Sequence, residues 1–523
     1  MAKRKREHKA EALSNKAKAP QVVNTVKKQR LDRPATKQAS QLNGTKHIDT
    51  KVNGPKLNGS ATKHQSASIS DGTSQPVIVS SAVSRSGNPT IQIISGSYER
   101  ALHGITAELE INDEGLEVKY SDSFLMNAHS FAIRCLALSP MPQDASEGVL
   151  LATGGSDERV NVYSLSASPL PEQDSKGRKV PSMPSLGPNK VAENPANREL
   201  GTLVQHSANV TALHFPSRSK LLSASEDNTI SITRIRDLQE VSNIKAPKPK
   251  VSGQASGDSA AAGTTPAGVN DFAIHPSMKL MVSVGQGERT MRLWNLVTGR
   301  KAGVLNFERD LLQAVKEGKY SHGEGRKIRW NKAGTEFAIS FERGVLVFGQ
   351  DSKARCTILP QPLTKVHHID YFSVDAEHEL LAVSTENGRM FFYSTQSITD
   401  NGKELPMLPP QSYTGGSDMG IKSRIKDFTI LDLTSHGFEG VCLIIGCSDG
   451  NVSLITIPRE QFSKQTFSEK PIGRISIPYR TANRITCLEA FVMLPAYDID
   501  GGLSEAESVL GSEVTTEDEE DSS

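Results

Sequence analysis

Short apolar runs alternate with polar turns along most of the chain after residue 88. Each unit contains two strand-length pieces around a tight polar turn, which is typical of a β-hairpin. The clearest examples are GVLLATGGSDERVNVYSL ending at Leu165, KLLSASEDNTISITRI ending at Ile235, and KLMVSVGQGERTMRLWNL ending at Leu296. Weaker copies are IQIISGSYERALHGITAEL from Ile91, TEFAISFERGVLVFG, ELLAVSTENGRMFFYS, and CLIIGCSDGNVSLITI ending at Ile457.

A further strand precedes the hairpin in the clearest units. These strands are AIRCLALSP from Ala132, NVTALHFPS from Asn209 and VNDFAIHPS from Val269. With room for an outer fourth strand, and with insertions left out, one unit takes about 35 to 45 residues, the period of a β-propeller blade. Seven such units are present, and the segment NRITCLEAFVML from Asn483 is expected to join the first blade and close the ring. The sequence therefore predicts an all-β fold, a seven-bladed propeller over residues 89–495.

Changes of composition divide the rest of the chain. Residues 1–88 are polar and nearly free of aromatics, so we expect a disordered basic tail, and residues 496–523 should form a disordered acidic tail. Insertions rich in Pro, Gly, Ser and Lys between units are expected to be disordered loops at about 166–199, 237–267 and 398–420. The segment FERDLLQAVKEG, residues 307–318, predicts a short helix whose apolar side packs on the propeller, with contact to a partner helix as the alternative.

The net charge of +1 conceals a separation of charge along the chain. Residues 1–66 hold 16 Lys and Arg against 4 Asp and Glu, whereas the chain closes with SEVTTEDEEDSS. Two basic clusters in the first tail predict nuclear import, with a merely solvated tail as the alternative. The predicted import residues are Lys3, Arg4, Lys5, Arg6, Lys27, Lys28 and Arg30.

Both tails suggest contacts with other molecules. The basic tail lacks interleaved aromatics, so any contact with RNA is expected to involve only its phosphates, without sequence specificity. The acidic end, from Glu505 to Asp521, carries Ser and Thr among its carboxylates. It could be a target of an acidophilic kinase or a mimic of nucleic acid, but a solubilising role is favoured slightly.

The composition argues against several classes of protein. The five cysteines are scattered and form no CxxC pair, which argues against a metal site or a disulfide framework and favours a reducing compartment. The longest apolar run, near Val441, is too short to span a bilayer, and the start of the chain lacks the apolar stretch of a secretory signal. We expect no cofactor, no metal and no membrane association.

Polar residue types recur at fixed places around the hairpin turns. In the second unit a histidine, a hydroxyl-bearing residue, an aspartate and an aromatic residue occur in this order along the chain. Other units keep part of this set. The candidate residues are His129, Thr153, Asp157, Tyr163, His206, Ser223, Asp227, Ser283, Glu288, Trp294 and Asp449. This set resembles the WD-repeat family, whose blades carry a structural hydrogen-bond relay of His, Ser/Thr, Asp and Trp.

A His–Asp pair could also be catalytic. No nucleophile on a strained turn accompanies either pair, and the pairs recur at the blade period, so a structural relay is the favoured interpretation. The resemblance also shows departures: Thr233 and Ile455 replace the Trp, Glu288 replaces the Asp, and the fifth and sixth units lack the relay. Those blades are expected to depend on apolar packing alone.

A narrower resemblance rests on HPSMKLMVSVGQGERTMRLWNLVTGRKAG, IISGSYERALHGI, HSANVTALHFPSRSKLLSASEDNTISI and ANRITCLEAF, which together span roughly residues 90–492. These segments look like the maintenance-of-killer and PAK-interacting subfamily of WD-repeat proteins. The resemblance implies a monomeric, non-enzymatic factor of the nucleus and nucleolus that binds pre-large-subunit particles through ribosome-assembly proteins. The long basic and acidic tails and the insertions depart from the subfamily pattern.

Two other functions stay open at the level of sequence. An adaptor that negatively regulates a PAK-type kinase is the runner-up, because animal relatives are described in that role. An enzyme is disfavoured, since no convergent catalytic set, phosphate loop or metal-ligand cluster is visible. The pair His367 and His368 beside a predicted strand is interpreted as polar residues of the propeller rim.

Overall fold

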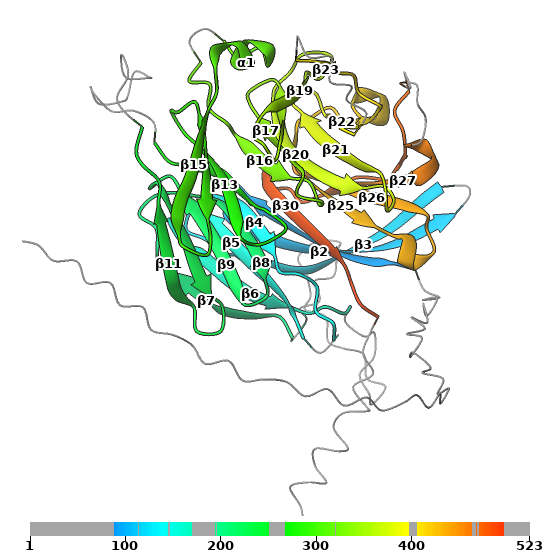
Figure 1. Ribbon diagram of the computed structural model, residues 1–523. Helices are drawn as coiled ribbons and strands as arrows, with labels where there is room; N and C mark the ends of the chain where they lie inside the picture. Colours follow the sequence, from blue (N-terminus) through cyan, green and yellow to red (C-terminus); the bar gives the residue numbers. More distant parts are fainter. Residues whose placement is uncertain are drawn as a thin grey trace, which may run out of the picture. The chain divides into compact units, whose positions relative to one another are not determined.

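The computed structural model describes residues 88–112, 115–144, 147–169, 194, 196–249, 267–318, 321–396, 405–462, 467 and 470–495. Within these ranges almost every regular element is a strand, and the strands form seven separate sheets (Figure 1). None of the helices described is long and apolar enough to cross a membrane. The predicted tails, including all the proposed import residues, lie outside the described residues.

Each sheet is one blade, described here from the innermost strand outward. Blades 1 to 4 consist of β30 (Ile485–Val492), β1 (Thr90–Ser97), β2 (Ala101–Asn112) and β3 (Gly115–Asn127); β4 (Ile133–Leu138), β5 (Val149–Gly155), β6 (Val160–Leu165) and β7 (Arg198–Leu203); β8 (Val210–Ser217), β9 (Lys220–Ser225), β10 (Thr229–Arg234) and β11 (Gln239–Lys245); and β12 (Val269–Ile274), β13 (Leu280–Gly285), β14 (Thr290–Asn295) and β15 (Arg300–Asn306).

The last three blades contain shorter outer strands. Blades 5 to 7 consist of β16 (Lys327–Trp330), β17 (Glu336–Ser340), β18 (Val345–Gly349), β19 (Ala354–Ile358) and β23 (Met407–Leu408); β20 (Val366–Ser373), β21 (Glu379–Thr385), β22 (Arg389–Tyr393) and β24 (Ser412–Gly415); and β25 (Ile425–Asp432), β26 (Gly440–Cys447), β27 (Asn451–Pro458), β28 (Arg474–Ile475) and β29 (Tyr479–Arg480). All strand pairs are antiparallel except β19 with β23.

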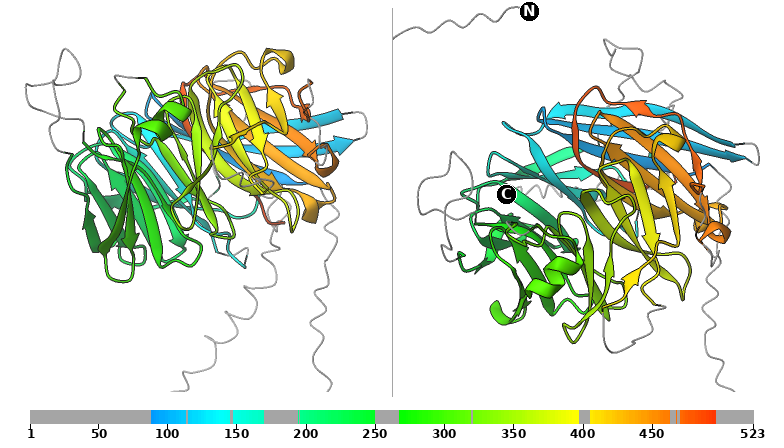
Figure 2. Two further views of the ribbon diagram at one scale, coloured as in Figure 1. Left: turned by 45° about the horizontal axis from the view of Figure 1, so that its top comes forward. Right: turned by 90° about the horizontal axis from the view of Figure 1, so that it is seen from above.

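The innermost strands close a ring. They contact one another in the cyclic order β30, β4, β8, β12, β16, β20, β25 and back to β30. The last strand, β30, pairs antiparallel with β1, with Ile93 opposite Ala490, so the chain's end completes its first blade. Seen from above, the colours pass around a common centre (Figure 2). The predicted seven-bladed propeller and its closing strand are confirmed.

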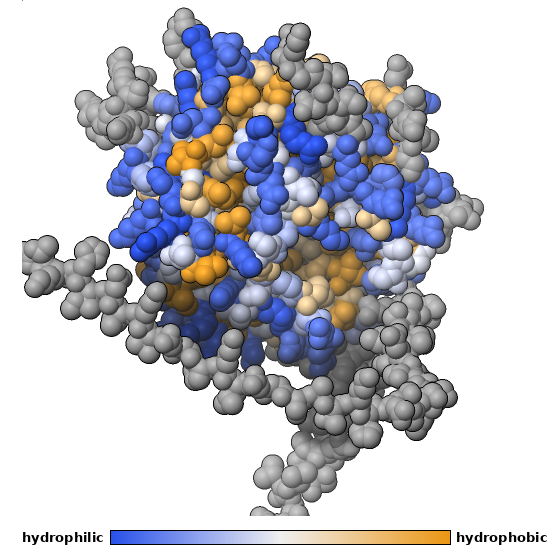
Figure 3. Space-filling model, viewed as in Figure 1, coloured by the Kyte–Doolittle hydropathy of each residue, from blue (hydrophilic) through white to orange (hydrophobic). Residues whose placement is uncertain are grey.

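The core lies between neighbouring blades because both faces of each sheet are covered. Between blades 1 and 2, for example, Ile94, Phe124, Ile133 and Leu151 pack in one cluster, each at most 3% exposed. Strand β26 is buried along its whole length, GVCLIIGC, as expected for a strand that is covered on both faces. The face in Figure 3 is mostly hydrophilic, with apolar residues in separate patches.

Side chains of the inner strands join one blade to the next. The hydroxyl of Thr486 donates to the carbonyl of Ile133 (2.6 Å), and the hydroxyl of Thr211 donates to the carbonyl of Val269 (2.6 Å). In the next seam Asn270 donates its side-chain amide to the carbonyl of Gly325 (2.8 Å). These bonds occupy backbone groups that the ring leaves without a partner strand.

All three expected insertions overlap with regular elements of the structure. Strand β11 lies inside the expected loop 237–267, and β23, β24 and the 3₁₀ turn Ser417–Met419 lie inside 398–420. The first residues of β7 lie at the end of 166–199. An outer strand pairs on one side only and faces water, so its polar composition resembles that of a loop. The rest of these insertions falls largely outside the described ranges.

The predicted helix is present but short. Helix α1 spans Arg309–Ala314, and the 3₁₀ turns Thr434–His436 and Arg459–Gln461 lie in blade 7. Phe307, Leu312 and Val315 are buried against Phe341 and Phe348 of blade 5. The apolar side of this segment therefore packs on the propeller, as expected from its pattern.

Candidate functional site

One face of the propeller carries the predicted relays. We call it the relay face and define it by the loops that enter each innermost strand and the turns that join the second and third strands of each blade. In blade 2, His129 precedes β4 and Asp157 lies in the turn between β5 and β6. The His129 ring is held from both nitrogens: Nδ1 lies 2.8 Å from Asp157 Oδ1 and Nε2 lies 2.7 Å from the Thr153 hydroxyl.

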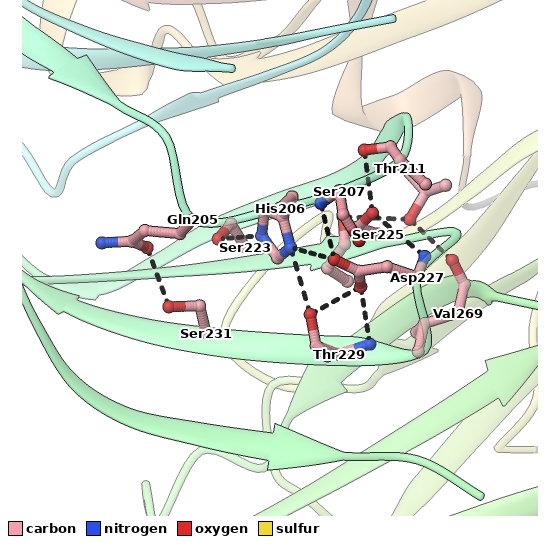
Figure 4. A network of polar contacts seen from close by, with 12 residues as sticks. Gln205, His206, Ser207, Thr211, Ser223, Ser225, Asp227, Thr229, Ser231 and Val269 are labelled. Atoms are coloured by element: carbon pink, nitrogen blue, oxygen red, sulfur yellow. Dashed lines mark hydrogen bonds and ion pairs between the residues drawn. The ribbon is translucent and has the colours of Figure 1, made fainter. Parts of the chain in front are cut away.

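Blade 3 repeats this geometry (Figure 4). His206 Nδ1 lies 3.2 Å from Asp227 Oδ2 and Nε2 lies 2.8 Å from the Ser223 hydroxyl. Thr229 adds a hydroxyl 3.1 Å from the same Nδ1, and the Ser207 backbone N–H donates to Asp227 (3.1 Å). Each relay thus ties the loop before a blade to the hairpin turn within it.

The relay carboxylates are held ionised. Burial alone would raise the pKa of Asp157, but hydrogen bonds from Ser130 N–H and His129 outweigh it and lower the pKa below its ordinary value. Burial also acts to raise the pKa of Asp227, but hydrogen bonds with His206, Thr229 and the Ser207 N–H outweigh burial and lower this pKa. An anion that accepts several hydrogen bonds is a structural anchor.

Three of the predicted relay residues take other partners. Tyr163 packs between blades 1 and 2, and its hydroxyl interacts with Asn161. A phenol carries its hydroxyl at the far end of the ring, whereas an indole N–H projects sideways, so Tyr cannot replace Trp here. Glu288 pairs with Arg292, and the bonds of exposed Asp449 within the described residues are to Asn451. These three assignments to a complete relay were wrong.

Blade 4 retains the last link of the relay. Trp294 Nε1 donates to the Ser283 hydroxyl (2.8 Å), and both residues are at most 3% exposed. In blade 3, where Thr233 stands at the Trp position, its hydroxyl donates to Gln205 Oε1 (2.9 Å). At this position the Thr233 hydroxyl of blade 3 bonds to Gln205, whereas the Trp294 indole of blade 4 bonds to a serine of the neighbouring strand.

Sequence reasoning missed a related contact in blade 1. Glu99 lies in the turn after β1, and its Oε2 accepts a hydrogen bond from the Arg484 backbone N–H (2.8 Å). This corresponds to the bond from Ser130 N–H to Asp157 (2.9 Å). An acidic residue directly after a strand that ends in small residues was the available signal.

Charged side chains line the middle of the ring, which sequence reasoning also missed. Asp271 and Arg329 form an ion pair (2.7 Å), and Asp427 lies 3.2 Å from His368 Nδ1. Burial raises the pKa of Asp427 to about 6. Burial, with Asp427 and Asp370 nearby, raises the pKa of Glu489 to about 8. These residues come from five different innermost strands, so their proximity exists only in the closed ring.

The two adjacent histidines differ from each other. His367 contacts Glu386 (2.5 Å), but His368 is turned inward, with its ring edge-on to Phe428 at 5.1 Å between centroids. The rim assignment was therefore wrong for His368. Across the described residues, no group of three or more His, Cys, Asp or Glu is placed to hold a metal ion, and all five cysteines are free and buried.

A shallow cavity of about 530 Å³ lies on the opposite side of blade 6. Its wall is mostly apolar, and residues of the wall include Val374, Leu380, Leu408 and Phe462. Asp375 and His378, at its edge, bond to each other (2.9 Å). This cavity has no convergent set of polar groups aimed at a ligand, so it does not resemble a catalytic centre.

Comparison with known proteins agrees with this architecture. Residues 197–233, which span β7 to β10, match the family described as "WD domain, G-beta repeat". The chain is 27% identical to Protein MAK11 of Saccharomyces cerevisiae, over 69% of this chain and 76% of that protein. It is 23% identical to a p21-activated protein kinase-interacting protein 1-like protein of Xenopus laevis, over 77% and 82% of the two chains. The chain therefore belongs to the WD-repeat family that includes MAK11 and the p21-activated protein kinase-interacting proteins.

Proposed function

We propose that this chain is a non-enzymatic scaffold in the assembly of the large ribosomal subunit, where it binds precursor particles through protein partners in the nucleolus. The observation that carries the proposal is the likeness to MAK11 over most of both chains. The narrower resemblance found in the sequence implies the same role.

The geometry supports a binding role over a catalytic one. The imidazoles of His129 and His206 have both nitrogens occupied, and their carboxylate partners also anchor backbone N–H groups. These groups are thus committed to the fold and have no proton to exchange with a substrate. A ring of sheets with fixed loops offers rigid surfaces, and propellers commonly use such surfaces to hold partners.

The tails add to the proposal. The basic clusters at Lys3–Arg6 and Lys27–Arg30 would supply nuclear import and salt-dependent contact with rRNA phosphates. The tail would then supply the contact with RNA, and the propeller would supply the contact with a protein.

The second candidate is an adaptor that negatively regulates a PAK-type kinase. It is favoured by the names of the relatives from Xenopus laevis, Gallus gallus and Danio rerio, each a p21-activated protein kinase-interacting protein 1-like protein. A kinase partner and a ribosomal partner could share the same rigid surface, so only an experiment separates them.

Affinity purification of the tagged full chain followed by sucrose-gradient sedimentation tests the proposal. We expect the chain to sediment with precursors of the large subunit and their rRNA. A chain ending before Ile485, which cannot close its ring, is the negative control. Sedimentation only as a free protein, with a PAK-type kinase as the enriched partner, would instead establish the adaptor.

A further inference from the structure

Two large aromatic rings stand in water on the relay face. Tyr98 is 61% exposed and Phe131 is 63% exposed, although neither supports the core. The loops that carry them are neighbours, because Ala128 N–H, in the loop of Phe131, donates to the carbonyl of Arg100, in the turn of Tyr98 (3.2 Å). Tyr98 N–H in turn donates to the carbonyl of Arg484 (2.9 Å). Exposed aromatics on adjacent loops form a surface that flat apolar groups can stack against.

Both rings are carried by backbone that is held in place. Phe131 follows His129 and Ser130, which are bonded to Asp157 at 2.8 and 2.9 Å. The turn of Tyr98 is tied to the next loop by the bond from Arg484 N–H to Glu99. A ligand that stacks on these rings therefore has little loop entropy to remove.

A cation lies against one of the two rings. The Arg484 guanidinium lies 5.7 Å from the centre of the Tyr98 ring. Lys426, two residues after Arg424, is close enough to Arg424 and Arg484 that burial and these two charges lower its pKa. Within the described part of the chain, neither the Lys426 ammonium nor the Arg484 guanidinium forms an ion pair or a hydrogen bond.

Two carboxylates of the relay face are paired with arginines. Glu226 lies 3.5 Å from Arg134, and Glu386 contacts both Arg424 (3.3 Å) and His367 (2.5 Å). Glu99 accepts the Arg484 backbone N–H. The Arg484 guanidinium, with Lys426 in its electrostatic reach, is therefore available to a ligand beside the exposed ring of Tyr98.

We propose that this surface binds single-stranded RNA, with phosphates at Lys426 and Arg484 and unpaired bases stacked on Tyr98 and Phe131. The inference rests on the proposed role in ribosome assembly and assigns the propeller its own RNA contact, separate from the basic tail. Interleaved cations and aromatic rings are the combination that single strands require. A duplex keeps its bases stacked inside, and an acidic peptide would use the cations without the rings.

The test is fluorescence-anisotropy titration of a labelled 12-nucleotide single-stranded RNA with the full chain. The background is K3A/R4A/K5A/R6A/K27A/K28A/R30A, which removes the tail's contribution. We expect Tyr98→Ala and Phe131→Ala each to weaken binding about five- to a hundredfold. Lys426→Gln should reduce the slope of log affinity against log salt by about 0.7.

Matched controls lie on the opposite face. Val297, 76% exposed, and exposed Arg300 sit there, so Val297→Ala and Arg300→Ala should leave the affinity unchanged. Melting temperatures confirm that every variant folds. Equal affinity for a duplex of the same length, or unchanged affinity in both aromatic variants, would overturn the inference, as would preference for a synthetic peptide of residues 512–523 over RNA.

The inference and the proposed function can fail separately. If the tail-neutralised chain has no affinity for the RNA but the wild-type chain still sediments with precursor particles, only the RNA site is wrong. If Tyr98→Ala/Phe131→Ala loses RNA affinity and the wild-type chain never sediments with these particles, the RNA site stands and the assembly role is wrong.

Discussion

A histidine bonded through both ring nitrogens has one orientation, and this decides what His129 and His206 do. Each ring spans from a turn carboxylate to a strand hydroxyl at 2.7 to 3.2 Å. The His206 ring is almost fully buried, with 1% of its side chain exposed. An unpaired polar group there would cost about 1–3 kcal/mol, so the relay is retained even where its last member is not Trp.

Removing a relay carboxylate should destabilise the propeller. We expect Asp157→Ala and Asp227→Ala each to lower the free energy of unfolding by about 1–3 kcal/mol, measured by thermal or urea denaturation at pH 7. Asp449→Ala, in the corresponding turn of blade 7, removes only exposed local bonds and should change it by less than about 0.5 kcal/mol. Equal melting curves for all four proteins would contradict the relay.

The same carboxylates predict a dependence on acid. Their folded pKa is depressed, so their stabilisation is present above the unfolded pKa of about 3.9 and is lost as pH falls through the folded value. The difference in stability between wild type and Asp227→Ala should therefore shrink between pH 5 and pH 2. A difference that grows over this range would show that the carboxylate is not held ionised.

Glu489 predicts the opposite trend. Its pKa is raised to about 8 by burial and by Asp427 and Asp370, so the stability attached to it is present below the unfolded pKa of about 4.3 and declines as pH rises toward 8. We expect Glu489→Gln to melt at a higher temperature than wild type at pH 9 and at nearly the same temperature at pH 4. A difference in melting temperature between the two proteins that stays the same from pH 4 to pH 9 would show that the pKa of Glu489 is not raised.

At the scale of elements, the fold depends on one non-local pairing. Strand β30 joins β1 across nearly the whole sequence and also contacts β4 and β25 (Figure 1). Without it, β1 would have an unpaired edge and the ring would have a gap between blades 1 and 7. Among the strands that the structure describes, no other blade pairs two that are so far apart along the chain.

Truncation tests the closing strand. A chain ending before Ile485 should lose cooperative unfolding and be cleaved rapidly by protease, because the inner edges of β1, β4 and β25 become accessible. A chain ending after Pro495 keeps every described strand and should melt within about a degree or two of the full chain, since a surface change usually stays within about 0.5 kcal/mol. Cooperative melting of the shorter chain would refute closure by β30.

At the scale of the whole molecule, charge and fold are divided between different parts of the chain. The propeller includes ion pairs on and inside its ring, whereas the excess of positive charge is concentrated in residues 1–66. Neutralising the seven tail cations should therefore leave the melting temperature unchanged and move a fluorescently tagged chain from nucleus to cytoplasm. Arg300→Ala/Lys301→Ala, on β15, is the control for loss of charge, and nuclear retention of the neutralised chain would exclude the predicted import signal.

The sequence by itself determined the blade count, the closing strand and the His, hydroxyl and Asp members of the relays in blades 2 and 3. These features follow from local patterns: strand-length apolar runs, polar turns that recur from unit to unit, and a hydroxyl residue and an Asp at the same spacing in units two and three, Thr153 with Asp157 and Ser223 with Asp227. Outer strands such as β11 escaped prediction because a strand that faces water needs no apolar pattern.

Only the tertiary structure decided which groups from different blades meet. Asp271, Arg329, Asp427 and Glu489 are far apart in sequence, and closure of the ring places them around one axis and shifts the pKa values of Asp427 and Glu489. The proximity of the loops that carry Tyr98, Phe131 and Arg484 has the same origin. Spacing along a chain specifies contacts within a hairpin, whereas contacts between hairpins depend on how the blades are stacked around the ring.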